Sequence, residues 1–280
     1  MPFKIDQTWL LGILTVGFIG GAFFIMTFLQ SATAPILCKT AGMLAAAAAG
    51  NSSSSSSSSQ TQLLDAIFHY ATSRLTPQQS VQEIRMSMEV LKRLGPTNFL
   101  VFGLGYDSLM WTALNLGGTT LFLEDDPKFY DAIAGRNPNI TAHLVKYTTK
   151  MSEAGELVQH FRNEPDCSAT RSALRGNRRC RLALHMLPDG VYDVEWDLIL
   201  IDGPKDSYAE APGRMAPIYS AAVMARNRNR SGVTHVFLHD VHRKVEKVYA
   251  EMFLCRKYLV GAVGNLWHFQ IPPTSNTHFC

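Results

Sequence analysis

The sequence lacks several signals that mark common binding sites. Its five cysteines include no Cys-x-x-Cys pair, which argues against a zinc ribbon. No Gly-Lys-Ser/Thr triplet occurs, which excludes a Walker phosphate-binding loop, and Ser108 stands where a Gly-x-Gly-x-x-Gly dinucleotide fingerprint needs its third glycine. The net charge is only +3, too small to argue for nucleic acid, so we expect no nucleic-acid partner.

The residues that are present suffice for a folded enzyme. The chain has 280 residues, of which 46% are hydrophobic and 18% charged, so it can bury a full core. One domain of catalytic size with added segments is therefore expected.

The N-terminal part is predicted to tie the chain to a membrane. Residues 9–29 carry no charge over about the length that a helix needs to cross a bilayer. A cleaved signal peptide is the alternative, because small residues follow this run. We expect residues 1–8 to be a short cytosolic tail, residues 9–29 an uncleaved signal anchor, and residues 30–60 a flexible Ala/Ser-rich stem. Residues 61–280 would then form the luminal domain.

The sequence leaves open whether two of the cysteines form a disulfide. Cys167 and Cys180 bracket a basic segment that has no strand pattern and no strong helix pattern. In an oxidising compartment a bridge between them would stabilise the fold by roughly 3 kcal/mol. Two free thiols are the alternative.

From residue 61 onward the hydrophobic periodicity alternates. Two helices are expected first, over residues 63–75 and 80–94, and Ser80 with Glu83 resembles a capping box. Five strands that alternate with helices follow, at residues 98–103, 119–124, 142–147, 196–202 and 233–240. A hairpin around Gly264 and Asn265 ends the domain. We predict an α/β fold with a mostly parallel sheet and a C-terminal antiparallel hairpin, which resembles the Rossmann-like class I S-adenosylmethionine-dependent methyltransferases.

The first strand leads into the turn "FGLGYDS", where such sheets bind their ligand. S-adenosylmethionine carries no phosphate, so a third glycine is not needed. An acid about 20 residues on would accept hydrogen bonds from ribose hydroxyls. The predicted cofactor-binding residues are Gly103, Gly105, Asp107, Ser108 and Glu124.

Acidic and histidine side chains follow the next two buried strands. Asp202 ends "WDLILID", and His239 and Asp240 end "VTHVFLHD". Side chains of these types take a proton from a hydroxyl or bind a divalent cation. The predicted catalytic residues are therefore Asp202, His239 and Asp240, with His239 or Asp240 as the base and with Asp202 and Asp240 as metal ligands. A structural role for Asp202 is the alternative.

Long motifs carry a family resemblance. The stretches "NFLVFGLGYDSLMW", "TTLFLEDDP", "WDLILIDGPKDSYAEAPGRM" and "GVTHVFLHDVHRKVE" resemble the plant glucuronoxylan 4-O-methyltransferase family, whose relatives include arabinogalactan O-methyltransferases and irregular-xylem proteins. The resemblance implies a type II Golgi membrane protein. It also implies methyl transfer from S-adenosylmethionine to O4 of glucuronic acid on glucuronoxylan, or the same reaction on arabinogalactan.

The acceptor site follows from the same resemblance. Lys205 and Arg214 are expected to pair with the uronic carboxylate, although Arg214 can instead be a packing arginine. Tyr106 replaces a frequent histidine, and Asp206 with Ser207 departs from the pattern "VDAPKGY". These departures affect the choice of acceptor more than the methyl-transfer reaction. A non-catalytic xylan-biosynthesis factor and another enzyme on the same sheet remain the alternative functions.

Overall fold

The computed structural model describes residues 53–171 and 173–280. The predicted cytosolic tail and signal anchor, and most of the predicted stem, lie outside these residues. Within the part of the chain that is described, no helix is both long enough and apolar enough to cross a membrane.

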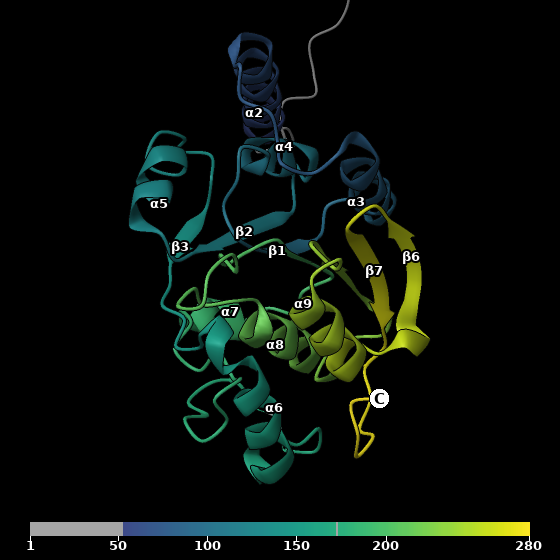
Figure 1. The fold of residues 1–280 in the computed structure, drawn as a ribbon. Coiled ribbons are helices and arrows are strands. Elements are labelled where there is room, and N and C mark those ends of the chain that lie inside the picture. The colour runs from purple at the N-terminus through teal and green to yellow at the C-terminus, as the bar shows by residue number, and fades with distance from the viewer. Residues whose placement is uncertain (1–52, 172) are drawn as a thin grey trace, which may run out of the picture. The chain divides into compact units, whose positions relative to one another are not determined.

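The elements alternate as the sequence predicts (Figure 1). In chain order the helices are α2 (Ser53–Thr72), α3 (Val81–Leu94), α4 (Ser108–Leu114), α5 (Pro127–Ile133), α6 (Ala154–Asn163), α7 (Asp189–Asp193), α8 (Met215–Arg226) and α9 (Lys244–Tyr249). The strands are β1 (Asn98–Phe102), β2 (Thr119–Glu124), β3 (Ala142–Leu144), β4 (Leu198–Ile201), β5 (Thr234–Leu238), β6 (Leu259–Val263) and β7 (Leu266–Ile271). Short 3₁₀ turns lie at 151–153, 165–167 and 256–258, and a π-helical turn extends α9 over 250–254.

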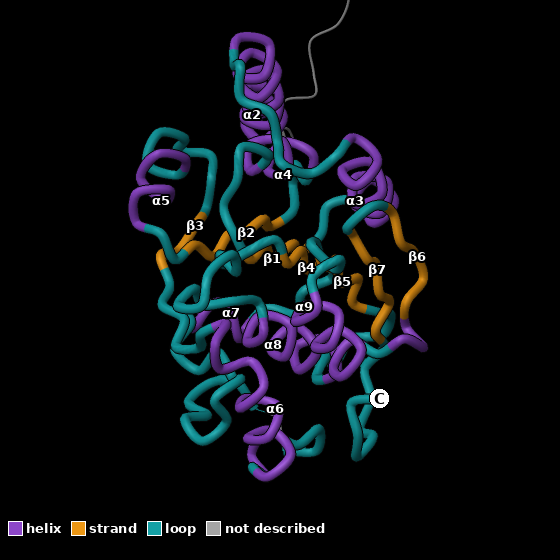
Figure 2. The backbone as a smooth tube through the Cα atoms, viewed as in Figure 1, coloured by secondary structure: helices purple, strands orange, loops and turns teal. Residues whose placement is uncertain are grey.

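The strands form one sheet in the order β3-β2-β1-β4-β5-β7-β6, which Figure 2 shows from one edge to the other. The first five pair in parallel, and β7 runs antiparallel to both β5 and β6. This topology confirms the predicted α/β fold, with a mostly parallel sheet and a C-terminal antiparallel hairpin. Phe102 pairs with Leu123 of β2 and with Ile201 of β4, so β1, β2 and β4 end side by side.

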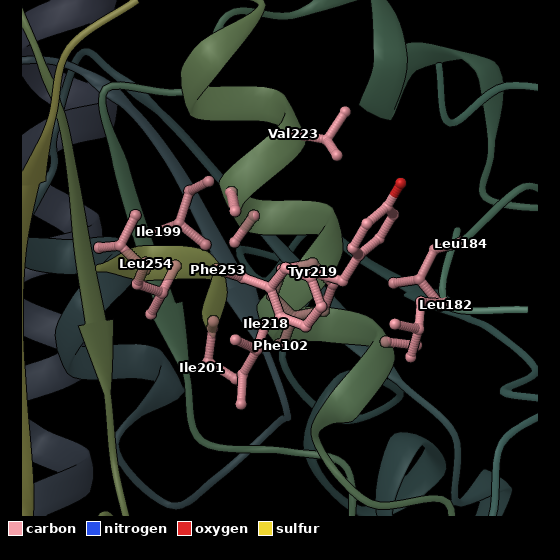
Figure 3. Packing of buried hydrophobic residues seen from close by; sticks show 14 of the residues in the cluster. Phe102, Leu182, Leu184, Ile199, Ile201, Ile218, Tyr219, Val223, Phe253 and Leu254 are labelled. Atoms are coloured by element: carbon pink, nitrogen blue, oxygen red, sulfur yellow. The ribbon is translucent and has the colours of Figure 1, made fainter. Parts of the chain in front are cut away.

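Alternate side chains of β1 enter two separate cores. Leu100 and Phe102 pack with α8 and the α9 region, as Figure 3 shows for Phe102 against Ile218 and Phe253. Phe99 and Val101 pack on the other face with α2, α3 and α4. Both faces of the sheet are therefore buried, which is why its strands are almost continuously apolar.

Several local predictions are confirmed and a few need correction. The Ser80–Glu83 capping box is present. Helix α2 begins at Ser53, so the boundary expected at residue 61 falls inside a helix, because serine extends an established helix at little cost. Helix α7 was not predicted. Cys167 and Cys180 are disulfide-bonded, and a second disulfide, between Cys255 and Cys280, was not anticipated.

Candidate functional site

A cavity of about 380 Å³ opens where β1, β2, β4 and β5 end. In open α/β sheets this edge binds the ligand, and the volume lies within the range of roughly 300–1,000 Å³ that is common for small-molecule sites. The predicted site residues that line it are Gly103, Gly105, Asp107, Glu124, Asp202, Lys205, Arg214 and Asp240. The other two, Ser108 and His239, are buried and are not among the lining residues.

The two glycines after β1 make room for atoms of the protein itself. Gly103 has a φ of +108°, and a Cβ there would lie 3.0 Å from the backbone nitrogen of Gly203. A Cβ on Gly105 would lie 2.5 Å from Oδ1 of Asp107. The turn is thus packed closely against the loop after β4, and its backbone forms part of the cavity wall.

Ser108 and Asp107 hold this turn in place. The backbone N–H of Gly105 donates to Oγ of Ser108 at 2.9 Å, so Ser108 shapes the turn from inside. Asp107 accepts a 2.7 Å hydrogen bond from Nε1 of Trp111. Burial raises the pKa of Asp107 to about 6, and the negative charge of Asp202 acts in the same direction. The Asp107 carboxyl group is therefore easier to protonate than an exposed aspartate.

Glu124 joins the end of β2 to the turn after β1. Its Oε2 accepts from the backbone N–H of Leu104 at 2.9 Å, and its Oε1 accepts from those of Asp125 and Asp126 at 3.0 and 2.8 Å. Burial raises the pKa of Glu124, although these hydrogen bonds lower it in part. One lone pair on Oε2 is left for a ligand hydroxyl, so its role at the ribose stays a prediction.

Asp202 and His239 form a hydrogen-bonded pair. Nδ1 of His239 donates to Oδ1 of Asp202 at 2.9 Å, and Nε2 of Gln79 donates to Oδ2 at 2.8 Å. Burial alone would raise the pKa of Asp202, but the His239 hydrogen bond and the charge of Arg214 hold it below its usual value. Burial alone would lower the pKa of His239, but Asp202 and its charge raise it. Nε2 of His239 faces Glu83 Oε1 at 3.6 Å, so this histidine supports Asp202 from behind.

Arg214 binds the ends of β4 and β5 together. Its Nη1 donates to the carbonyl of His239 at 2.9 Å, and its Nη2 donates to the carbonyl of Asp202 at 3.0 Å. Nη2 also lies 2.8 Å from Oδ2 of Asp240. Asp240 has a φ of +62°, a left-handed backbone that is uncommon outside glycine and clusters at functional sites. The Arg214 guanidinium is thus engaged by the protein, which favours the packing role that the sequence left open.

Lys205 is the most exposed of the three cations in the cavity wall. Its exposed side chain places Nζ 2.7 Å from Oδ2 of Asp126, and this hydrogen bond raises the pKa of Lys205. Because a surface ion pair is weak, Lys205 can exchange Asp126 for a carboxylate of a ligand.

Asp206 and Arg243 also line the cavity, and the sequence did not single out Arg243. Asp206 was expected beside the acceptor, yet it is buried, ion-paired to Arg243 and 3.7 Å from Nε of Arg214. Arg243 also faces Asp240 at 3.3 Å, three residues earlier. The three-residue spacing from Asp240 is a signal that could have pointed to Arg243.

A candidate metal-binding group lies at the same edge. Asp202, His239 and Asp240 each offer a ligand atom, and these atoms lie within 4.8 Å of one another. Carboxylate oxygen and imidazole nitrogen suit several divalent metals, so the donor set fits the predicted cation. Arg214 lies against both carboxylates and would compete with it.

The charge of the cavity wall is negative. The acidic lining residues are Asp107, Glu124, Asp125, Asp202, Asp206 and Asp240, and the basic ones are Lys205, Arg214 and Arg243. Each of these three cations already faces a carboxylate. Such a wall favours a positively charged ligand over a phosphate.

Comparisons with known proteins give the following similarities. The family model described as IRX15/IRX15L/GXM matches residues 82–269. Arabinogalactan O-methyltransferase 1 of Arabidopsis thaliana is 51% identical over 96% of this chain and 93% of its own length. Glucuronoxylan 4-O-methyltransferase 1 of the same plant is 45% identical over 78% of this chain and 79% of its own length.

Among solved structures, an O-methyltransferase from Bacillus cereus in complex with SAH is 13% identical with a TM-score of 0.41. That alignment covers 75% of this chain and 90% of the bacterial protein.

Proposed function

Because this chain belongs to the IRX15/IRX15L/GXM family, we propose that it is an O-methyltransferase that uses S-adenosylmethionine to methylate glucuronic acid on a plant cell-wall polysaccharide. The observation that carries the proposal is the acid-lined cavity at the ends of β1, β2, β4 and β5. A sulfonium cation suits this wall better than a phosphate does.

Arabinogalactan is the first acceptor to test. The arabinogalactan relative is more similar over a larger share of the chain than the glucuronoxylan relative, which reverses the order that the sequence motifs favoured. Methylation at O4 of glucuronic acid on glucuronoxylan is the second candidate. A uronic carboxylate would approach Lys205, whose exposed ammonium has only a surface partner.

S-adenosylmethionine supplies an electrophilic methyl group when it is bound. The backbone of Gly103 and Gly105 would lie along its amino acid arm, and Glu124 would accept from its ribose. Tyr106 and Phe129 line the same cavity with their ring centroids 5.8 Å apart, and they offer an apolar surface for a purine.

Residues of this chain would accept the proton of the acceptor hydroxyl. When the sugar oxygen bonds to the methyl carbon, the carbon–sulfur bond breaks and S-adenosylhomocysteine leaves, so the hydroxyl proton must move to a base within hydrogen-bond reach. Asp240 lines the cavity and His239 does not, so we assign the proton to the Asp240 carboxylate. Arg214 orients Asp240, and Asp202 with His239 holds the neighbouring charge in place. A divalent cation held by Asp202, His239 and Asp240 would lower the pKa of the sugar hydroxyl.

We also propose that the protein is a single-pass type II protein of the Golgi membrane with its catalytic domain in the lumen. The uncharged run at residues 9–29 supports an anchor. The two disulfides support an oxidising compartment on the side of the domain.

Methyl transfer tests the proposal directly. The full chain, purified in detergent, is incubated with labelled S-adenosylmethionine and with either arabinogalactan or unmethylated glucuronoxylan. Label is expected in the glucuronic acid of arabinogalactan, and Asp240→Asn should reduce it by about 10²-fold or more. A folded protein that neither binds the cofactor nor labels either polysaccharide would instead indicate the non-catalytic factor, an alternative that the irregular-xylem part of the family keeps open.

A further inference from the structure

Glu246 is an acidic side chain that the proposed reaction does not use. It lies on α9 with 0% of its surface exposed. Neither of its carboxyl oxygens has a hydrogen-bond partner within the described residues. A buried carboxylate without donors costs several kcal/mol, so the group needs a physical explanation.

A second carboxyl group lies beside it. Asp206, from the loop between β4 and α8, is in hydrogen-bond range of Glu246. Oδ2 of Asp206 is also buried without a hydrogen-bond partner, 3.7 Å from Nε of Arg214, whereas its Oδ1 is ion-paired to Arg243. The charges that face Glu246 are those of Asp206, Arg214 and Arg243. Both arginines also face Asp240, so they are shared with a further carboxylate, and an ionised Glu246 would repel Asp206.

We propose that Glu246 is a positioning residue that keeps its proton and donates it in a hydrogen bond to Asp206. One proton gives both carboxyl groups a hydrogen-bond partner and leaves Asp206 ionised, so that it still binds Arg243. Burial of Glu246, together with the nearby charge of Asp206, agrees with this, because it raises the pKa of Glu246 to about 7.

The protonation state of Glu246 would affect the cavity through the loop that carries Asp206. Lys205 and Ser207, the neighbours of Asp206 in the chain, both line the cavity. When Glu246 loses its proton, Asp206 loses a hydrogen bond and gains a repulsive neighbour, so the loop is held less firmly. Acceptor binding should therefore weaken above neutral pH, a conclusion that rests on the proposed function.

The first test needs no methyl transfer. A carboxyl group with a raised pKa binds its proton more tightly in the folded state, so its stabilising effect is lost as pH rises from the unfolded pKa toward about 7. Glu246→Gln keeps a donor for Asp206 but does not titrate. Thermal unfolding of the full chain in detergent is measured between pH 5 and 8. The Tm of the parent should fall relative to that of Glu246→Gln by roughly 5 °C.

The controls separate this pair from general effects of pH. The control variant Glu251→Gln changes an exposed side chain five residues further along the chain. Its Tm should depend on pH as the Tm of the parent does. Parallel Tm curves for the parent and Glu246→Gln would overturn the proposal. Should Glu246→Gln fail to fold, Asp206→Asn takes its place. It should reduce the pH dependence, and an unchanged dependence would count against the proposal.

The second test measures the KM for the polysaccharide acceptor. The KM for polysaccharide in the parent is expected to rise about tenfold between pH 6 and 8, while that of Glu246→Gln stays flat. The same rise in both proteins would contradict the positioning role. If no polysaccharide is methylated at all, the proposed function fails. The unfolding measurements still show whether Glu246 keeps its proton.

Discussion

Gly103 and Gly203 bring the ends of β1 and β4 into backbone contact: a Cβ on Gly203 would lie 2.7 Å from the Cα of Gly103. This contact lies in the cavity wall, between the turn after β1 and the loop that carries Asp202. The turn's conformation therefore depends on the neighbouring strand as well as on its own residues.

Gly103→Ala should destabilise the protein and weaken cofactor binding. The new Cβ would meet the Gly203 backbone, and the φ of +108° is unfavourable for alanine, so a loss of about 1–3 kcal/mol is expected. Urea unfolding measures the stability, and calorimetry with S-adenosylhomocysteine measures the binding. Gly155→Ala, at a site where no atom lies within 4 Å of the new Cβ, is the matched control and should be neutral or slightly stabilising.

Glu124→Gln should reduce the affinity for S-adenosylhomocysteine by about tenfold or more, which corresponds to roughly 1.4 kcal/mol. The amide would replace one acceptor oxygen with a donor where the carboxylate now accepts from Leu104, Asp125 and Asp126. Calorimetry gives the affinity, and circular dichroism checks the fold. Unaltered affinity in a folded variant would remove Glu124 from the ribose site. Glu89→Gln, on an exposed face of α3, should bind as the parent does.

The sheet was predictable because local patterns agree with one another. Strands β1, β2 and β4 are short apolar runs that end in or directly before a glycine or an acid, and the capping box of α3 is encoded in Ser80 and Glu83. The parallel topology then gathers Gly103, Glu124 and Asp202 at one edge without further information.

The details of the site depend on contacts between distant residues. Gln79 reaches Asp202 across 123 positions, and no sequence spacing encodes such a contact. The sequence placed Asp206 near the acceptor and left Arg214 open between the acceptor and a packing role; in the fold both line the cavity, and both are ion-paired within the protein. The Cys255–Cys280 pairing likewise depends on how the C-terminal segment returns to the end of α9.

Removing divalent cations tests the metal proposal. If Asp202, His239 and Asp240 hold a cation that activates the acceptor, chelation should abolish methyl transfer, and added metal should restore it. The assay is label transfer before and after dialysis against chelator. Full activity after chelation would show that Asp240 and Arg214 act without a metal.

Loss of the Cys167–Cys180 disulfide should lower the free energy of unfolding by roughly 3 kcal/mol. The bridge closes a loop with a sequence separation of 13, which limits the freedom of the unfolded chain. The double variant Cys167→Ser/Cys180→Ser is compared with the parent by urea unfolding under non-reducing conditions. An unchanged free energy of unfolding in the double variant would contradict this contribution of the Cys167–Cys180 bridge.

Acid should destabilise the protein through a buried histidine pair in the sheet. His235 on β5 and His268 on β7 lie with Nδ1 and Nε2 2.9 Å apart, and the His268 ring stacks on Phe237. Burial lowers the pKa of each histidine to about 4, and the positive charge of Arg93 acts in the same direction. Both histidines are therefore neutral in the folded state at a pH where the unfolded chain already takes up protons. Their contribution is fully present above the unfolded pKa of about 6.5 and is lost as pH falls toward 4, with a slope of up to two protons.

The measurement is urea unfolding at several pH values between 7.5 and 4.5. The double variant His235→Gln/His268→Gln should lose clearly less stability over this range than the parent, because its amides do not titrate. His242→Gln serves as the control, since His242 is 54% exposed and should leave the slope unchanged. Equal slopes in the parent and the double variant would mean that other groups, above all the carboxylates whose pKa is held low in the folded state, account for the acid sensitivity.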